Sequence, residues 1–185
     1  MTQFEFLSVF ISIVLALGVS DILSTWGEQI RFRSKVRHYW LHTAWGILLL
    51  LLMIQAWWGL WRFRDREDWT FFENVTLIVP YLLLALTVYV LTPRISSEPS
   101  DIKDYYYVNA PWIFGLGGGA LVAFTINAKV NLGTGLLDPQ NAIRAVGIMI
   151  MAGLAVSRRE RVHAGAAALA AILLIAWIST TLLAL

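Results

Sequence analysis

Two carboxylates lie near the end of the first apolar segment, on one face of the helix that this segment would form. Asp21, Thr25 and Glu28 fall within an arc of about 60° when each residue turns a helix by 100°. An ionisable side chain inside a membrane span is costly in lipid, so it is expected to face protein or water. We therefore predict a polar cluster centred on Asp21. In the alternative reading, Asp21 pairs with Arg94 or with a loop arginine and only fixes the register of the helices.

Further polar residues are expected near the same side of the membrane, because they lie at the matching ends of other apolar segments. They are His42 in the second segment, Arg94 after the third, Asn109 in the fourth and His163 in the sixth. On the opposite side, Glu73 is expected to pair with Arg144 or Lys129. Long basic side chains near helix ends also reach water without a partner, so this pairing has a simple alternative.

The three histidines are the residues best suited to hold a metal or a haem, since the chain has no cysteine. His38 and His42 are four residues apart and share a helix face, but a zinc site needs two further ligands. His42 and His163 would reach a haem from two helices, and its axial ligands must oppose each other across the ring. Histidines at this depth are more often hydrogen-bonded or solvated, so we predict neither a metal nor a cofactor.

The composition assigns the chain to the membrane. Of its 185 residues 58% are hydrophobic and 14% are charged, whereas about a quarter of a soluble domain is charged. Tryptophan and tyrosine near the segment ends are typical of an aromatic belt at the membrane interface, and we expect no nucleic-acid partner. The chain has no G-x-S-x-G, P-loop or H-E-x-x-H motif, which favours a protein that is not an enzyme.

Six segments approach the roughly 20 apolar residues that a helix needs to cross the hydrocarbon core. Backbone groups in lipid must be paired within each segment, which favours helices over an open sheet. We therefore predict an all-α, polytopic membrane helical bundle that forms a single domain over residues 1–185. The predicted spans are residues 4–26, 39–63, 71–91, 107–128, 143–157 and 162–183, of which the fifth is short.

The basic residues predict the orientation, because lysine and arginine favour cytoplasmic loops. With six spans, the first, third and fifth loops lie on one side and carry nine of the 14 lysines and arginines. We therefore place these loops in the cytoplasm and both termini outside it.

Three stretches carry a resemblance to known proteins. They are the opening FEFLSVFISIVLALGVSDIL, the basic entry R-x-R-x-x-x-R-H-Y-W to the second segment and its exit QAWWGLW. With these stretches the chain resembles a group of small bacterial integral membrane proteins that have no assigned activity. The resemblance runs from the first segment to the start of the fourth. It implies a bacterial inner membrane and supplies no catalytic residues.

The leading functional hypothesis is a homo-oligomeric channel or carrier-like pathway for an ion or small solute. Asp21 and Glu28 would line its cytoplasmic mouth and attract cations. The first alternative is an accessory or assembly subunit of a larger membrane complex, and the second is a haem- or metal-holding redox protein. Small residues at every fourth position from Ser8 to Ser24 predict close helix packing and suit either of the first two hypotheses. The expected partners are the lipid bilayer, further copies of the chain and, under the first alternative, other membrane subunits.

Overall fold

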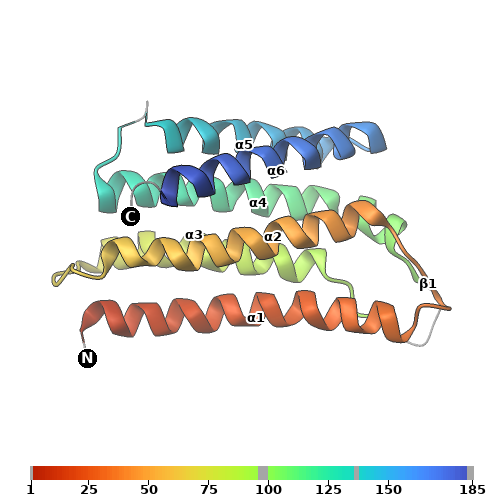
Figure 1. The fold of residues 1–185 in the computed structure, drawn as a ribbon, viewed down its shortest axis with the longest axis horizontal. Helices are drawn as coiled ribbons and strands as arrows, with labels where there is room; N and C mark the ends of the chain where they lie inside the picture. The colour runs from red at the N-terminus through yellow and green to blue at the C-terminus, as the bar shows by residue number, and fades with distance from the viewer. Residues whose placement is uncertain (1, 96–99, 136–137, 183–185) are drawn as a thin grey trace.

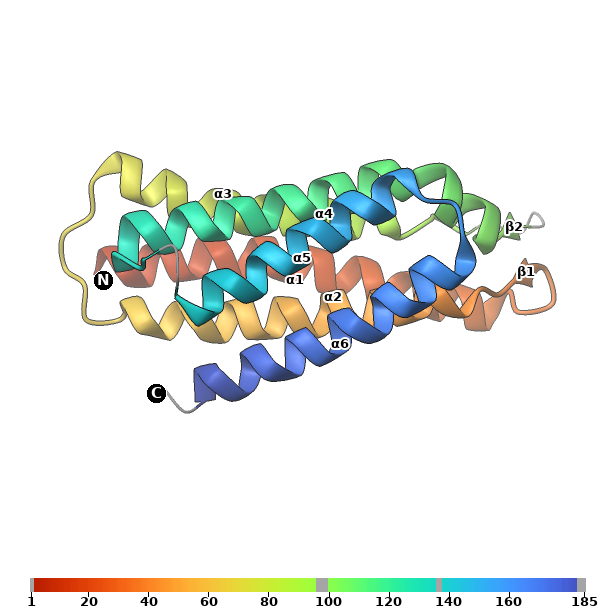
Figure 2. The same ribbon diagram turned by 90° about the horizontal axis from the view of Figure 1, so that it is seen from above.

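The computed structural model describes residues 2–95, 100–135 and 138–182. In this part of the chain six helices are long and apolar enough to cross a membrane, which confirms the all-α, multi-pass bundle. Successive helices run in opposite directions (Figures 1 and 2). The helices are α1 (Gln3–Arg31), α2 (Trp40–Gly59), α3 (Phe71–Leu91), α4 (Ile102–Leu132), α5 (Pro139–Val156) and α6 (Glu160–Leu182), with a short 3-10 helix η1 (Leu60–Phe63) continuing α2.

The two ends of the bundle are built differently. The start of α1 and the end of α6 lie at one end, together with the α2–α3 and α4–α5 connections (Figure 1). We call this the terminal end. The opposite end, the strand end, holds the two-residue strands β1 (Val36–Arg37) and β2 (Ser100–Asp101), which pair in parallel. The basic residues predict that the strand end is cytoplasmic, and this orientation stays a prediction.

Local chemistry fixes where the helices begin and end. Side-chain oxygens of Thr2, Thr70, Asp101 and Asp138 accept hydrogen bonds from the first turns of α1, α3, α4 and α5. Because Asp138 caps α5, that helix has 18 residues and begins at Pro139 rather than at 143. It is therefore long enough to count as a span. α4 ends at Leu132 and is capped by Gly133, whose φ of 63° lies in the left-handed region that favours glycine.

Packing is closest between α3 and α4, with α1 against α3 and α5 against α4. In Figure 1, α1 and α5 lie on opposite sides of the bundle. The tight contact of α1 is at Gly18, where an added Cβ would come within 2.5 Å of the Met53 Cε. The small residues of α1 that were expected to pack closely do so only in part within this chain. Ser12 is half-buried and accepts a hydrogen bond from the Trp57 indole of α2 (3.1 Å), whereas Ala16, Ser20 and Ser24 lie on the exposed face.

Candidate functional site

The predicted cluster at the strand end is partly assembled around the end of α3. The Thr25 hydroxyl donates to the Pro93 carbonyl (3.4 Å), and the Ile95 amide donates to the Glu28 carboxylate (3.0 Å). Asp21 is half-buried and forms no hydrogen bond or ion pair with the described residues. Thr25 and Glu28 therefore hold the chain that leaves α3, and Asp21 lies beside them without a bonding partner in that part of the chain.

His42, like Thr25 and Glu28, binds the backbone at the end of α3. It is 1% exposed, and its Nε2 donates to the carbonyl oxygen of Leu91 (2.9 Å). Leu91 is the last residue of α3, so its carbonyl has no amide of its own helix to accept from. The remaining predicted members lie apart: Arg94 is exposed, and the Asn109 amide donates to the Tyr105 carbonyl of its own helix (2.9 Å).

His163 forms a separate buried link between α4 and the α5–α6 turn. Its Nε2 lies 2.9 Å from the carbonyl oxygen of Ser157, and its Nδ1 lies 2.7 Å from the Tyr106 hydroxyl. A carbonyl only accepts, so Nε2 carries the proton and Tyr106 donates to Nδ1 of the neutral ring. Because both nitrogens are engaged, this ring offers no nitrogen to a haem iron in the present arrangement.

His38 is also engaged through both of its ring nitrogens. Its Nδ1 lies 3.2 Å from the Gln29 side-chain oxygen, and its Nε2 lies 3.4 Å from the Thr43 hydroxyl. Among residues 2–95, 100–135 and 138–182, no three histidine, aspartate or glutamate side chains form a group that could hold a metal ion. The His38 and His42 side chains thus bind different parts of the fold.

Loop contacts at the strand end are electrostatic as well. Arg37 and Asp101 form an ion pair across the β1–β2 ladder (3.3 Å). Hydrogen bonds from the Asp104 and Lys103 amides, together with the charge of Arg37, hold the pKa of Asp101 below its usual range. Asp101 therefore caps α4 and joins it to the α1–α2 connection.

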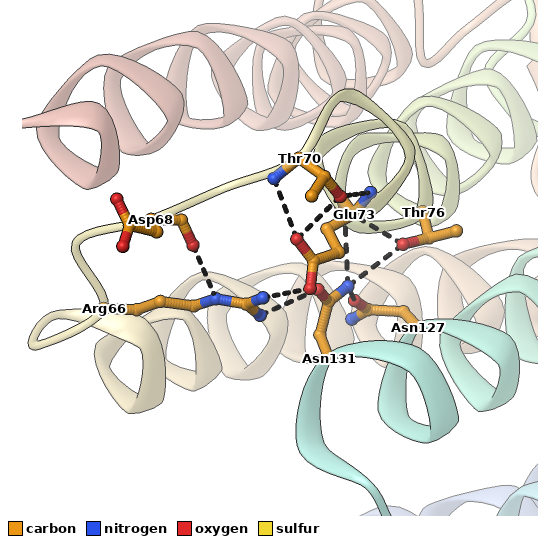
Figure 3. A network of polar contacts seen from close by, with 7 residues as sticks. All are labelled: Arg66, Asp68, Thr70, Glu73, Thr76, Asn127 and Asn131. Carbon is orange, nitrogen blue, oxygen red and sulfur yellow. Dashed lines mark hydrogen bonds and ion pairs between the residues drawn. The ribbon is translucent and has the colours of Figure 1, made fainter.

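A larger polar network lies at the terminal end (Figure 3). Arg66, on the α2–α3 connection, forms an ion pair with Glu73 and donates to the Asn131 side-chain oxygen (2.9 Å). The Asn131 amide group donates in turn to the Asn127 oxygen (2.7 Å) and the Thr76 hydroxyl (3.0 Å). The network therefore joins α3 to α4 through side chains.

Glu73 thus has a different partner from either residue that the sequence suggested. Its carboxylate also accepts from the Thr70 amide (2.8 Å) in the capping box of α3, which places it beside the preceding connection and Arg66. Lys129 is exposed, and Arg144 is buried on α5. Neither candidate therefore pairs with Glu73, because the local cap decides where the carboxylate points.

Asn127 connects this network to a partly open cavity, which we call the arginine chamber. The chamber has a volume of about 50 Å³. Among the described residues that line it, Arg62 and Arg144 are the charged ones. The described residues of the lining are Gln55, Ala56, Gly59, Arg62, Phe63, Tyr81, Phe124, Asn127, Ala128, Leu132, Gln140, Arg144 and Trp177.

The guanidinium groups of the chamber are incompletely hydrogen-bonded. Arg144 is 7% exposed; its Nη1 donates to the Asn141 side-chain oxygen, and its Nε has no partner in the described chain. Arg62 donates through Nη1 to the Gln140 side chain (3.2 Å), and its buried Nη2 likewise has no partner there. A buried donor without an acceptor costs about 1–3 kcal/mol. An anion in the chamber would recover part of that cost.

Aromatic and acidic neighbours complete the surroundings of Arg144. The Trp177 ring lies 5.6 Å from the Arg144 Cζ, in a cation–π arrangement. The negative charge of Asp138 attracts the Arg144 guanidinium, and the positive charge of Arg62 repels it. The Asp138 side chain accepts from the Gln140 amide (2.8 Å) as the cap of α5, so it is already hydrogen-bonded. Two cations against one carboxylate leave the chamber positive.

An apolar cleft of about 90 Å³ lies between α2, α4, α5 and α6. Arg144 and Trp177 line both the cleft and the chamber, so the two cavities adjoin at these residues. Apart from Arg144, the described residues that line it are uncharged: Trp45, Leu48, Leu49, Leu52, Leu121, Ile143, Gly147, Ile150, Met151, Ala170, Leu173, Leu174 and Trp177. A cationic pocket and a hydrocarbon-like groove therefore adjoin inside the bundle.

Comparison with known proteins finds no family model, no curated protein and no solved structure that matches this chain. The functional argument therefore depends on the site itself. Sequence analysis named Arg144 only as a partner of Glu73 and did not name Arg62 or Gln140. One signal was present: Arg144 lies inside an apolar segment, where an uncompensated charge marks a functional candidate.

Proposed function

We propose that this integral membrane protein binds a small organic anion in the arginine chamber and acts as a carrier-like protein for it. The observation that supports this most strongly is Arg144, buried in a membrane span with one N–H that has no partner among the described residues. Arg62 presents to the same chamber a second N–H without a partner in that part of the chain. A carboxylate would accept charge-assisted hydrogen bonds from either guanidinium, and such bonds are roughly twice as strong as neutral ones.

The size and position of the chamber favour a carboxylate as the recognised group. A water molecule needs about 10–15 Å³ of such space, so a cavity of about 50 Å³ has room for a few non-hydrogen atoms. The half-buried Arg62 and Gln140 lie near the terminal end of the bundle. The ligand would therefore enter from that end, which the loop charges predict to be extracytoplasmic.

The cation pathway through Asp21 and Glu28 has less support. Glu28 is hydrogen-bonded to the Ile95 amide, and Thr25 beside it is hydrogen-bonded to the Pro93 carbonyl. The pathway stays a prediction, and cation flux into vesicles with and without Asp21→Asn tests it. A homo-oligomer or a place in a larger complex also stays a prediction, for which the exposed small residues of α1 are the available surface.

Anion binding can be tested on the full chain in phosphatidylcholine nanodiscs. Radiolabelled hexanoate is the probe, with empty nanodiscs subtracted, and the variant is Arg144→Gln. Losing a hydrogen bond to a charged group costs about 1.5–3 kcal/mol, so we expect hexanoate affinity to fall about tenfold or more. Arg158→Gln is the matched control, because Arg158 is exposed at the strand end.

A second variant, Arg62→Gln, removes the other guanidinium and makes the test independent of how well one variant folds. Equal hexanoate affinity in wild type, Arg144→Gln and Arg62→Gln would overturn the proposal. Uptake of hexanoate into reconstituted vesicles then separates a carrier from a protein that only binds.

A further inference from the structure

We infer that the ligand is a single-chain amphiphile, with its carboxylate at Arg144 and its alkyl chain in the apolar cleft. This inference rests on the proposed function, because it takes anion binding at Arg144 as given and identifies the rest of the ligand. The observation that carries it is the shared lining of the two cavities. Arg144 and Trp177 line both the arginine chamber and the cleft, so a head group held by Arg144 has the cleft directly beside it.

The cleft has the form of an extended groove. On α2 its wall runs from Trp45 to Leu52, which is about 10 Å at the helical rise of 1.5 Å per residue. Small residues of the facing helices, Gly147 on α5 and Ala170 on α6, contribute to the lining. An added Cβ at Gly147 would come within 2.9 Å of the Leu121 Cδ1, so α5 lies close against α4 along the groove. The shape suits one chain rather than two.

The apolar walls of the cleft favour an amphiphile over a fully hydrophilic anion. A polar body would have to lie against the apolar walls of the cleft or leave that space unused, and burying unpaired polar groups is costly. An alkyl chain leaves lipid for the cleft without that cost, because lipid tails are as apolar as leucine side chains. The alkyl chain alone therefore gives little affinity. Binding should require the carboxylate and the alkyl chain of the ligand together.

A photolabel tests this arrangement directly in phosphatidylcholine nanodiscs. The probe is dodecanoate with a diazirine at the end of its chain, and adducts are located by mass spectrometry. We expect adducts on the residues of α2 and α6 that line the cleft. Unlabelled dodecanoate should compete at concentrations at least tenfold lower than dodecanol, which lacks the charge, or succinate, which lacks the chain. Dodecyl phosphate as a fourth competitor tests whether a phosphate replaces the carboxylate.

A matched pair of variants tests the place of the chain. Ala170→Leu puts a larger side chain into the cleft, while Ala168→Leu adds the same side chain on the exposed face of α6. We expect Ala170→Leu to reduce labelling of the cleft at least fivefold and Ala168→Leu to leave it unchanged. The smaller Ala170→Val gives the same comparison if Ala170→Leu does not fold.

The outcomes separate this inference from the function on which it rests. Unchanged labelling in Ala170→Leu and Ala170→Val, or equal competition by succinate and dodecanoate, overturns the inference but leaves hexanoate binding at Arg144 standing. Equal labelling by a diazirine-tipped dodecanol would mean that the cleft takes up bilayer hydrocarbon without regard to charge, which also overturns it. Unaltered hexanoate affinity in both Arg144→Gln and Arg62→Gln removes the proposed function as well.

Discussion

Removing the hydroxyl of Tyr106 should destabilise the bundle through the histidine that it contacts. Tyr106 and His163 are both fully buried, and their hydrogen bond measures 2.7 Å. Tyr106→Phe leaves the acceptor Nδ1 without a donor, which costs about 1–3 kcal/mol in proteins generally. Hydrogen bonds between membrane helices average about 0.6 kcal/mol and reach about 1.7. From both figures together, we expect Tyr106→Phe to lower the free energy of unfolding by about 1–1.5 kcal/mol.

Replacing the histidine should cost more than replacing the tyrosine. His163→Leu removes two hydrogen bonds, so the Ser157 carbonyl also loses its donor. It further removes edge contacts with Tyr107 and Phe114, whose ring centroids lie 5.2 and 5.4 Å from the histidine ring. We expect a loss of about 2–3 kcal/mol. In the double variant the two effects should overlap by about 1 kcal/mol, because they share one hydrogen bond.

Unfolding in detergent titrated with dodecyl sulfate measures these free energies. Tyr89→Phe is the control, because Tyr89 is 53% exposed on α3 and its hydroxyl has no partner in the described chain. We expect that control to change stability by less than about 0.5 kcal/mol. Nitrogen chemical shifts of the His163 ring should place the proton on Nε2. A proton on Nδ1, or a Tyr106→Phe effect no larger than that of the control, would refute the reasoning.

Three predictions concern the strand end. His42→Leu should destabilise by about 1–2 kcal/mol in the same titration, because the Leu91 carbonyl loses its buried donor; His42→Gln, which keeps a donor, should recover part of it. Glu28→Ala should speed hydrogen exchange at the Ile95 amide, with unchanged exchange at mid-helix amides of α3 as the reference. Asp101, whose folded-state pKa is lowered, contributes stability above its ordinary pKa near 4 that is lost as pH falls through the lowered value. Thermal unfolding of Asp101→Asn should therefore lack this acid-dependent component, and parallel pH profiles of the two proteins would contradict the assignment.

Much of the fold follows from the sequence because lipid leaves few alternatives. Uncharged segments of sufficient length must form helices, and the third helix begins and ends at the predicted residues 71 and 91. The predicted limits were too narrow where polar residues extend a helix. α1 continues to Arg31, and α4 starts at Ile102, because its Asp101 cap forms before the apolar run begins. Hydropathy registers the lipid boundary, whereas capping chemistry decides where the helix itself stops.

The site was less accessible to sequence reasoning, because its members come from separate helices. Arg144 was identified as a basic residue, but its chamber depends on Arg62 and Trp177, which lie 82 and 33 residues away in the chain. Packing decides which face of a helix points into the bundle. The sequence of one segment does not show which other segments it packs against. By contrast, the face shared by Thr25 and Glu28 was predictable, because both lie on one helix at helical spacing.

The contact between the ligand's carboxylate and Arg144 can be measured directly by solid-state NMR on the protein in phosphatidylcholine bilayers. Dodecanoate carries a ¹³C-labelled carboxyl group and the protein carries ¹⁵N-labelled arginine. We predict dipolar dephasing from a guanidinium nitrogen within about 4 Å of the carboxyl carbon, as an ion pair requires. This signal should be reduced in Arg144→Gln, lost when Arg62→Gln is added to it, and kept in Arg158→Gln. Dephasing that is as strong in Arg144→Gln as in the wild-type protein, or that is absent from the wild-type protein at saturating dodecanoate, would contradict binding at Arg144.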